Sequence, residues 1–362
     1  MPRNEIPLSF NEKTVLWALT KWPTANDRQL AKSTGIKMST VTAIRNRLKR
    51  AGKFNTFRIP LMGRLGCELL KVCCYRLTSA RKPTETLKEL KSILAKQGSY
   101  FYAIADRFQL LTMSFHRNYT DSFMSDEALH LEFHEKGLVN LDSYHTVESI
   151  FPLELTRLIN IFDFSELVRK RFNLREKGDA AATAPDKAPS GLRKMSNIEK
   201  RVYQGLIANP DIVDNAIAHK IGITRQSVTK IRKRFQSEGL FATTKLPDFN
   251  TLGSEMLAFA HYRLKDDAGL AKRKKALAWT VKELPGFFQV ANDREGVILG
   301  LARDFPDTQD HIYNVLDIYQ REGFLAGEPK IMLFAVKDLN NLKDFTFGPI
   351  VDNVLGSGKR SK

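Results

Sequence analysis

The chain has 362 residues, 43% of them hydrophobic and 27% charged, with a formal net charge of +17. This length exceeds what one ordinary core organises, so two or more globular domains are expected. No uninterrupted apolar run is long enough to span a bilayer, which excludes a helical membrane protein. The positive charge favours a polyanionic partner, either nucleic acid or an anionic membrane surface.

Residues 1–60 predict a winged helix-turn-helix domain. Apolar residues recur at helical spacing, glycines end the second and third helices, and an extended stretch follows; these positions are Val15, Leu16, Leu19, Leu30, Gly35, Val41, Ile44, Leu48 and Gly52. Helix, helix, turn, helix and strand in this order are the parts of a winged helix.

Residues 61–152 predict a ferredoxin-like domain. Strand-like and helical patterns alternate in the order β-α-β-β-α-β, over 68–77, 83–98, 101–116 (two strands), 120–137 and 144–151. Cys67, Cys73 and Cys74 fit no zinc or disulfide spacing, and we expect them to be small core residues of a cytoplasmic protein in a reducing compartment.

Two connecting segments follow. Residues 153–174 have helical apolar spacing and are expected to form a helix that packs on the first half. Residues 175–194 are rich in Ala, Pro, Gly and charge, a composition that predicts a flexible linker.

The second half repeats the first at an offset of 187 residues. "VTAIRNRLKRAG" at 41–52 matches "VTKIRKRFQSEG" at 228–239, and "YRL" occurs at both 75–77 and 262–264. Without a gap up to about residue 117, this offset also places Asp106 and Arg107 on Asp293 and Arg294. The sequence therefore predicts a tandem duplication of a whole module.

The predicted fold class is α+β, with two copies of a winged helix-turn-helix followed by a ferredoxin-like βαββαβ domain. The expected boundaries are 1–60, 61–152, 153–174 and 175–194 for the first half and its connections, then 195–247 (second winged helix), 248–338 (second ferredoxin-like domain) and 339–362 (C-terminal tail).

The third helix of each winged helix is basic opposite its apolar stripe, and it has no acidic residue before Glu238. Charge runs on a solvated helix face usually alternate in sign, so this pattern favours binding to double-stranded DNA. The candidate DNA-binding residues are Ser39, Thr40, Thr42, Ala43, Arg45, Asn46, Arg47 and Arg50 in the first copy, and Arg225, Gln226, Thr229, Lys230, Arg232, Lys233 and Arg234 in the second.

The distribution of charge supports this interpretation. Residues 1–60 hold twelve basic against three acidic residues, and residues 196–247 hold nine against four, whereas residues 66–168 hold eleven against fourteen. The positive charge thus lies where the winged helices are predicted.

A winged helix joined to a βαββαβ domain resembles the Lrp/AsnC family of transcription regulators. The resemblance implies that the second domain dimerises and senses a small-molecule effector, and the hairpin residues Asp106, Arg107, Asp293 and Arg294 are candidates for an effector or interface role against a plain turn salt bridge. In this chain the two modules would pair within one polypeptide as a pseudo-dimer, with further homo-oligomers left open.

We therefore hypothesise that the two winged helices bind two unequal half-sites of DNA. Residues shared by the copies, Arg45/Arg232 and Arg47/Arg234, would hold phosphate, while residues that differ, Ser39/Gln226, Ala43/Lys230 and Asn46/Lys233, would read bases. We therefore expect a nucleoid-associated transcription regulator that is not an enzyme and uses no cofactor, metal or membrane.

Two alternatives stay open. Siroheme decarboxylases resemble Lrp/AsnC proteins in fold and occur as paired or fused copies, which would make the chain a tetrapyrrole enzyme. A low-specificity architectural DNA-binding protein is the other. His130 and His134 have a spacing that can hold zinc, but surface or packing histidines are the preferred interpretation.

Overall fold

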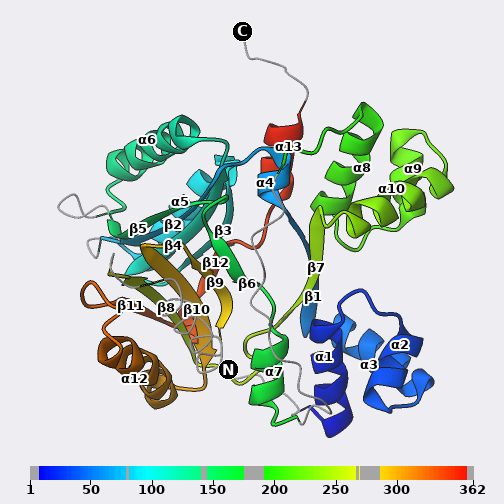
Figure 1. Cartoon of the computed structure of the whole chain (residues 1–362), viewed down its shortest axis with the longest axis horizontal. Coiled ribbons are helices and arrows are strands. Elements are labelled where there is room, and N and C mark those ends of the chain that lie inside the picture. Colours follow the sequence, from blue (N-terminus) through cyan, green and yellow to red (C-terminus); the bar gives the residue numbers. More distant parts are fainter. Residues whose placement is uncertain are drawn as a thin grey trace.

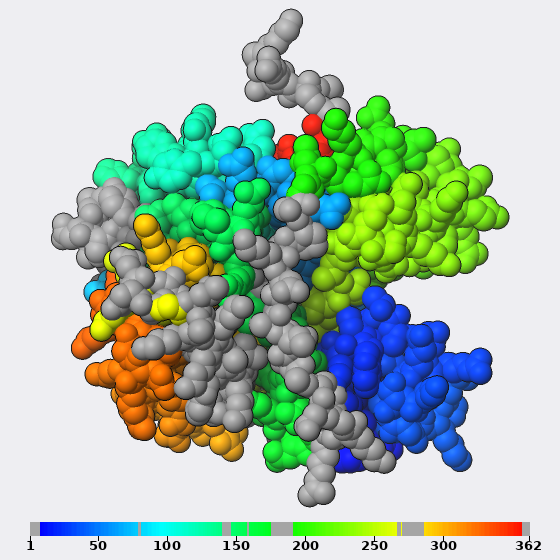
Figure 2. All heavy atoms as spheres, in the orientation of Figure 1, coloured from blue at the N-terminus to red at the C-terminus, as the bar shows by residue number. Residues whose placement is uncertain are grey.

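The computed structural model describes residues 8–78, 81–139, 145–174, 191–265, 269 and 286–356. The chain contains two structural copies of a winged helix followed by a ferredoxin-like domain, which confirms the predicted fold class (Figure 1). The two winged helices lie together on one side of the molecule, and the two ferredoxin-like domains lie together on the other (Figures 1 and 2).

The first winged helix consists of α1 (Phe10–Lys21), α2 (Asp27–Thr34), α3 (Met38–Arg50) and β1 (Phe54–Pro60). Capping boxes begin the first two helices: Ser9 and Glu12 exchange hydrogen bonds at α1, and Asn26 and Gln29 do so at α2. Gly35 ends α2 in the left-handed conformation, at φ 74°. These signals fix where each helix begins and ends, so the apolar stripes face one another.

The second winged helix has the same parts, namely α8 (Asn197–Ala208), α9 (Asp214–Ile221), α10 (Arg225–Ser237) and β7 (Phe241–Pro247). Ser196 and Glu199 form the capping box of α8, and Gly222 ends α9 at φ 80°. Val202, Leu206, Val228 and Phe235 are buried at the positions equivalent to Val15, Leu19, Val41 and Leu48, whereas Ile231, equivalent to Ile44, is half-buried.

Strands β1 and β7 pair with each other as an antiparallel ribbon that joins the two winged helices. Phe57 pairs with Thr244, and the two residues are also equivalent to each other in the two copies. The approximate two-fold axis that relates the copies therefore passes through this pair.

The first ferredoxin-like domain comprises β2 (Leu69–Arg76), α5 (Pro83–Lys96), β3 (Tyr100–Ala105), β4 (Gln109–His116), α6 (Tyr119–Glu135) and β5 (His145–Pro152), entered through the short α4 (Met62–Leu65). The described second domain comprises β8 (Met256–Arg263), β9 (Gly286–Ala291), β10 (Glu295–Ala302), α12 (Phe305–Arg321) and β11 (Lys330–Ala335), followed by a short 3-10 turn at Val336–Asp338. Residues 271–286, which the repeat aligns with the helix predicted over 83–98, lie almost entirely outside the described residues, and so does the basic run Lys272–Lys275 within them.

The two sheets face each other and form a common core. Val72 and Met113 of the first sheet share a buried cluster with Phe259 and Leu299 of the second. Helices α6 and α12 cover the outer faces (Figure 1). Cys67, Cys73 and Cys74 are buried free thiols in or beside β2, as the sequence predicted.

Each copy contributes a strand to the sheet of the other. Strand β6 (Arg157–Ile161) pairs with β9 of the second sheet, and β12 (Asn340–Lys343) pairs with β3 of the first. Each is followed by a short helix, α7 (Ser165–Arg171) or α13 (Gly348–Leu355), that packs on the winged helix of its own copy. The expectation of one helix over 153–174 that packs on the first half is thus wrong in part. The described residues of the expected C-terminal tail, 339–356, contain a strand and a helix.

An aromatic cluster lies where the exchanged strands meet. Phe162 and Phe345 adopt left-handed backbone conformations, with φ of 60° and 47°, and their ring centroids are 4.5 Å apart. Phe101 stacks on Phe347 at 4.8 Å, and the equivalent pair Phe287–Phe164 stacks at 4.7 Å. A positive φ is unfavourable for a bulky residue, so the packing of this cluster holds a turn that the local sequence does not favour.

Across the described ranges, no helix is both long enough and apolar enough to cross a membrane. Most of the expected linker, residues 175–190, lies outside the part of the chain that the structure describes.

Candidate nucleic-acid interface

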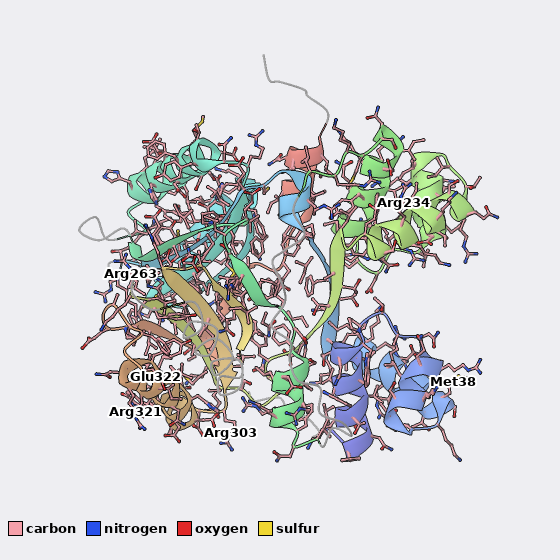
Figure 3. The ribbon with its side chains drawn as sticks, in the orientation of Figure 1. Met38, Arg234, Arg263, Arg303, Arg321 and Glu322 are labelled. Atoms are coloured by element: carbon pink, nitrogen blue, oxygen red, sulfur yellow. The ribbon has the colours of Figure 1, made fainter. Side chains whose placement is uncertain are left out.

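The third helix of each winged helix, α3 or α10, is open to solvent on the side away from its buried stripe. Val41, Ile44 and Leu48 are buried under α3, and Val228 and Phe235 under α10. Among the residues that the structure describes, neither helix is covered by a ferredoxin-like domain (Figures 1 and 2). Met38, at the start of α3, and Arg234, on α10, lie on the same side of the molecule (Figure 3).

An aspartate at the start of the second helix binds two candidate residues in each copy. The carboxylate of Asp27 accepts hydrogen bonds from Thr42 and Arg45, both at 2.7 Å. Asp214 accepts them from Thr229 at 2.7 Å and from Arg232 at 2.8 Å. Partial burial alone would raise the pKa of each aspartate, but the arginine and threonine hydrogen bonds outweigh it and lower the pKa.

Arg47 and Arg234, the other shared arginines, also have a partner within their own winged helix. Arg47 pairs with Glu12 at 2.8 Å, and Arg234 pairs with Glu199, so each arginine binds the glutamate of the first helix's capping box. The structure thus gives the shared residues an internal role that the phosphate hypothesis did not foresee. Their charges are already balanced by acids that fasten α3 and α10 to the neighbouring helices.

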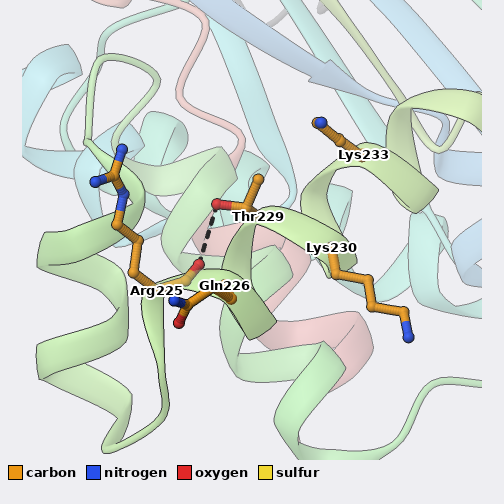
Figure 4. Close-up of a pocket in the computed structure, with 5 residues that line it drawn as sticks. All are labelled: Arg225, Gln226, Thr229, Lys230 and Lys233. Carbon is orange, nitrogen blue, oxygen red and sulfur yellow. Dashed lines mark hydrogen bonds between the residues drawn. The ribbon is translucent and has the colours of Figure 1, made fainter.

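The residues that differ between the copies face outward instead. Ser39, Ala43, Asn46 and Arg50 are exposed on α3. Arg225, Gln226, Lys230 and Lys233 are exposed on α10 and, with Thr229, line a shallow depression of about 510 Å³ (Figure 4). Thr40 is half-buried. The positions that hold Arg225, Gln226, Lys230 and Lys233 on α10 hold Met38, Ser39, Ala43 and Asn46 on α3. The exposed cations of α3 are Arg47, Lys49 and Arg50, which lie toward its C-terminal end.

The hairpin turns between the central strands differ from the expected alignment. Asp106 accepts hydrogen bonds from the backbone N–H groups of Phe108 and Gln109, at 2.7 and 2.9 Å, and Asn292 does the same in the second copy. Asp106 is therefore equivalent to Asn292, not to Asp293, and the offset has already fallen to 186 at this point. Arg107, Asp293 and Arg294 are exposed at the turn tips.

A buried polar cluster in the first ferredoxin-like domain was not predicted. The ammonium of Lys71 lies between the carboxylates of Asp126 and Glu148, and Lys71 is 1% exposed. Burial disfavours the charged ammonium, but the two carboxylates more than compensate and raise the pKa of Lys71. His116 is buried nearby and shares a 2.8 Å hydrogen bond with the hydroxyl of Ser114. Burial lowers the pKa of His116 to about 4.

The equivalent positions of the second copy, all within the described residues, are apolar. The strand and helix alignments place Ala258, Ile312 and Ile331 at the positions of Lys71, Asp126 and Glu148. Among the described residues no group of His, Cys, Asp and Glu is arranged to hold a metal ion. His130 packs its ring 6.0 Å from Tyr75, and His134 is exposed.

A repeat signal could have revealed the internal ion pairs. Glu12 and Asp27 recur as Glu199 and Asp214 at the common offset of 187, as their basic partners do. The Lys71 cluster leaves no such signal, because it occurs in one copy only.

No protein-family model and no curated protein matches the chain. Among solved structures, the siroheme decarboxylase NirDL covers 95% of this chain and 98% of its own, with 10% sequence identity and a TM-score of 0.51. An AsnC family transcriptional regulator from Agrobacterium tumefaciens covers 39% of this chain at 12% identity and a TM-score of 0.32, and E. coli AsnC covers 39% at 13% and 0.30.

The expectation that the chain is not an enzyme is contradicted by this comparison. The siroheme decarboxylase NirDL matches nearly the whole chain. At 10% identity the likeness establishes the fold: the chain has the architecture of NirDL over almost its entire length.

Proposed function

We propose that the chain binds double-stranded DNA through its two winged helices and acts as a transcription regulator. The observation that carries the proposal is the outward face of α10, where Arg225, Lys230 and Lys233 are exposed with no acidic residue among them. Exposed cations on a helix that protrudes from a winged helix suit the phosphates and base edges of a major groove.

The ribbon of β1 and β7 supports a particular kind of operator. Because an approximate two-fold axis passes through Phe57 and Thr244, the two third helices are related by the same kind of symmetry as the two halves of an inverted repeat. The half-sites would be unequal. Asn46 and Gln226 suit adenine, whereas Lys230 and Lys233 suit guanine.

The proposal includes a tandem duplication with domain boundaries near residues 60, 152, 194, 247 and 338. The two copies then form a pseudo-dimer within one chain. The reciprocal exchange of β6 and β12 supports this view, because such an exchange joins subunits in a dimer.

The test is DNA binding by fluorescence anisotropy, with an inverted-repeat site first selected from a random library. Lys230→Ala with Lys233→Ala should weaken binding at least tenfold and reduce the slope of log K against log salt by about 2. Arg263→Ala, an exposed arginine on the second ferredoxin-like domain, is the matched control and should change neither quantity (Figure 3).

Equal effects of the double variant and of Arg263→Ala would contradict the proposal. Selection of no preferred site from the library, with binding that depends on salt alone, would instead indicate an architectural DNA-binding protein.

A second candidate function is that of a tetrapyrrole enzyme, and the end-to-end likeness to a siroheme decarboxylase favours it. The test is to add siroheme to the purified protein and to follow the Soret absorbance and the mass of the tetrapyrrole. A shifted Soret band together with loss of carbon dioxide would support this candidate. An unchanged spectrum at saturating siroheme would count against it.

A further inference from the structure

A groove lies between the second winged helix and the C-terminal helix α13. Its volume is about 390 Å³, and its lining includes Gln204 and Asn209 of α8 and its C-cap, Ile217 and Lys220 of α9, and Asp352 of α13. It is separate from the outward face of α10, since none of the residues that line that depression also lines this groove.

The first copy fills the equivalent space with two indole rings. Trp17 and Trp22 stand at the positions of Gln204 and Asn209, and their ring centroids are 5.5 Å apart. The ammonium of Lys21 lies 5.4 Å from both rings. In the second copy Ala208 replaces Lys21, so this site has lost both aromatic rings and the cation that covers them.

The open groove combines an apolar floor with a cationic rim. Ile212, Ile217 and Ile221 supply the floor, and Arg201 and Lys220 stand at the rim. Within the described part of the chain neither cation forms an ion pair, whereas Asp352 accepts a 2.8 Å hydrogen bond from Gln204. With two cations against the one carboxylate of Asp352, the groove keeps a net positive charge that an anion can neutralise, and it has a floor that an apolar ring can cover.

We propose that this groove binds a small aromatic carboxylate. The ring occupies the place of the indoles of Trp17 and Trp22, and the carboxylate lies between Arg201 and Lys220. A bound molecule contacts α8, α9 and α13 at once, so it fixes the second winged helix against the helix that follows the exchanged strand β12. The inference does not depend on the proposed DNA binding.

The experiment is isothermal titration calorimetry on the full chain without DNA, with indole-3-carboxylate, indole and acetate as probes. Indole-3-carboxylate should bind, indole should bind at least tenfold more weakly because it lacks the charge, and acetate should give no measurable heat because it lacks the ring. Equal binding of acetate and indole-3-carboxylate, or no binding of any probe, overturns the proposal.

Two kinds of variant locate the site. Asn209→Trp restores a ring that the first copy carries at a C-cap of similar backbone conformation, with φ and ψ of −124° and 68° at Trp22 and −134° and 85° at Asn209, and it should abolish binding of indole-3-carboxylate. Gln204→Trp is a second filling variant with the same expected result, should the first fail to fold by circular dichroism.

Lys220→Ala should weaken the binding of indole-3-carboxylate at least tenfold and leave the affinity for indole unchanged. Lys91→Ala, an exposed lysine of the first ferredoxin-like domain, is the control and should alter neither affinity. Binding of indole-3-carboxylate that survives both filling variants in folded protein places the ligand elsewhere and overturns the proposal.

Discussion

The two halves of the molecule share the contacts that hold their domains together but differ in most of the side chains that they expose. Each winged helix holds its third helix with the same aspartate, threonine, arginine and glutamate, and each half lends a strand to the other's sheet. The outward faces of α3 and α10, the groove beside α8 and the Lys71 cluster occur in different form, or in one half alone. Residues that maintain the fold are therefore shared, and residues available for recognition have diverged.

The largest change in stability is expected from the Lys71 cluster, which occurs in the first half alone. Lys71→Met should lower the free energy of unfolding by about 3–5 kcal/mol, because it leaves the Asp126 carboxylate buried without its cation. A triple variant that copies the second half, with Lys71→Ala, Asp126→Ile and Glu148→Ile, should recover most of that loss. Urea unfolding followed by circular dichroism measures both, and a triple variant no more stable than Lys71→Met would contradict the argument.

The internal ion pairs should respond alike in the two halves. Asp27→Ala and Asp214→Ala each remove a carboxylate that accepts hydrogen bonds from a threonine and an arginine, so each should cost about 1–3 kcal/mol. Thermal unfolding of the two variants side by side is the measurement. Losses that differ by more than about 1.5 kcal/mol would show that the two pairs are not equivalent.

Lys245 and Arg58 are equivalent residues of the ribbon, but only Lys245 should make the stability of the protein depend on pH. Burial lowers the pKa of Lys245 to about 8, while an unfolded lysine titrates near 10.4. Between these values the unfolded chain keeps a proton that the folded chain has released, so stability rises with pH.

Between pH 8 and pH 9, the loss of the proton from Lys245 should raise the free energy of unfolding by roughly 1 kcal/mol. Lys245→Arg, which copies Arg58, should remove this part of the pH dependence because arginine stays charged. Denaturant titrations at the two pH values give the comparison, and an identical pH dependence in both proteins would refute the assignment.

The smallest effect is expected at the ion pair between Lys49 and Asp211, which joins the two winged helices. Both side chains are more than half exposed, at 56% and 55%, so Lys49→Ala should change the free energy of unfolding by less than about 1 kcal/mol. A larger loss in the same urea experiment would mean that this contact, and not only the ribbon, holds the winged helices together.

Local sequence signals predicted most of the fold. Apolar periodicity, with glycines such as Gly35 at the ends of helices, predicted the winged helices and the order of the strands. The exchange of β6 and β12 was missed because strand partners distant in the sequence leave no local pattern. The left-handed Phe162 and Phe345 are also set by tertiary packing, against the preference of the residue.

The helices that carry the candidate site were predicted from the sequence, but the contacts of their side chains were predicted only in part. Basic residues without acids located α3 and α10, yet sequence could not separate the arginines that pair internally from the lysines that face solvent. That distinction depends on Glu12, Asp27, Glu199 and Asp214, which lie on other helices of the same domain.

The exchange of β6 and β12 also bears on how the chain can be divided. A cut between residues 174 and 191 would leave two polypeptides, each with an edge strand seated in its neighbour's sheet. Such pieces should migrate as one particle in gel filtration and, when produced separately, should become soluble only after mixing. Removal or replacement of either half would therefore leave the sheet of the other half without one of its edge strands.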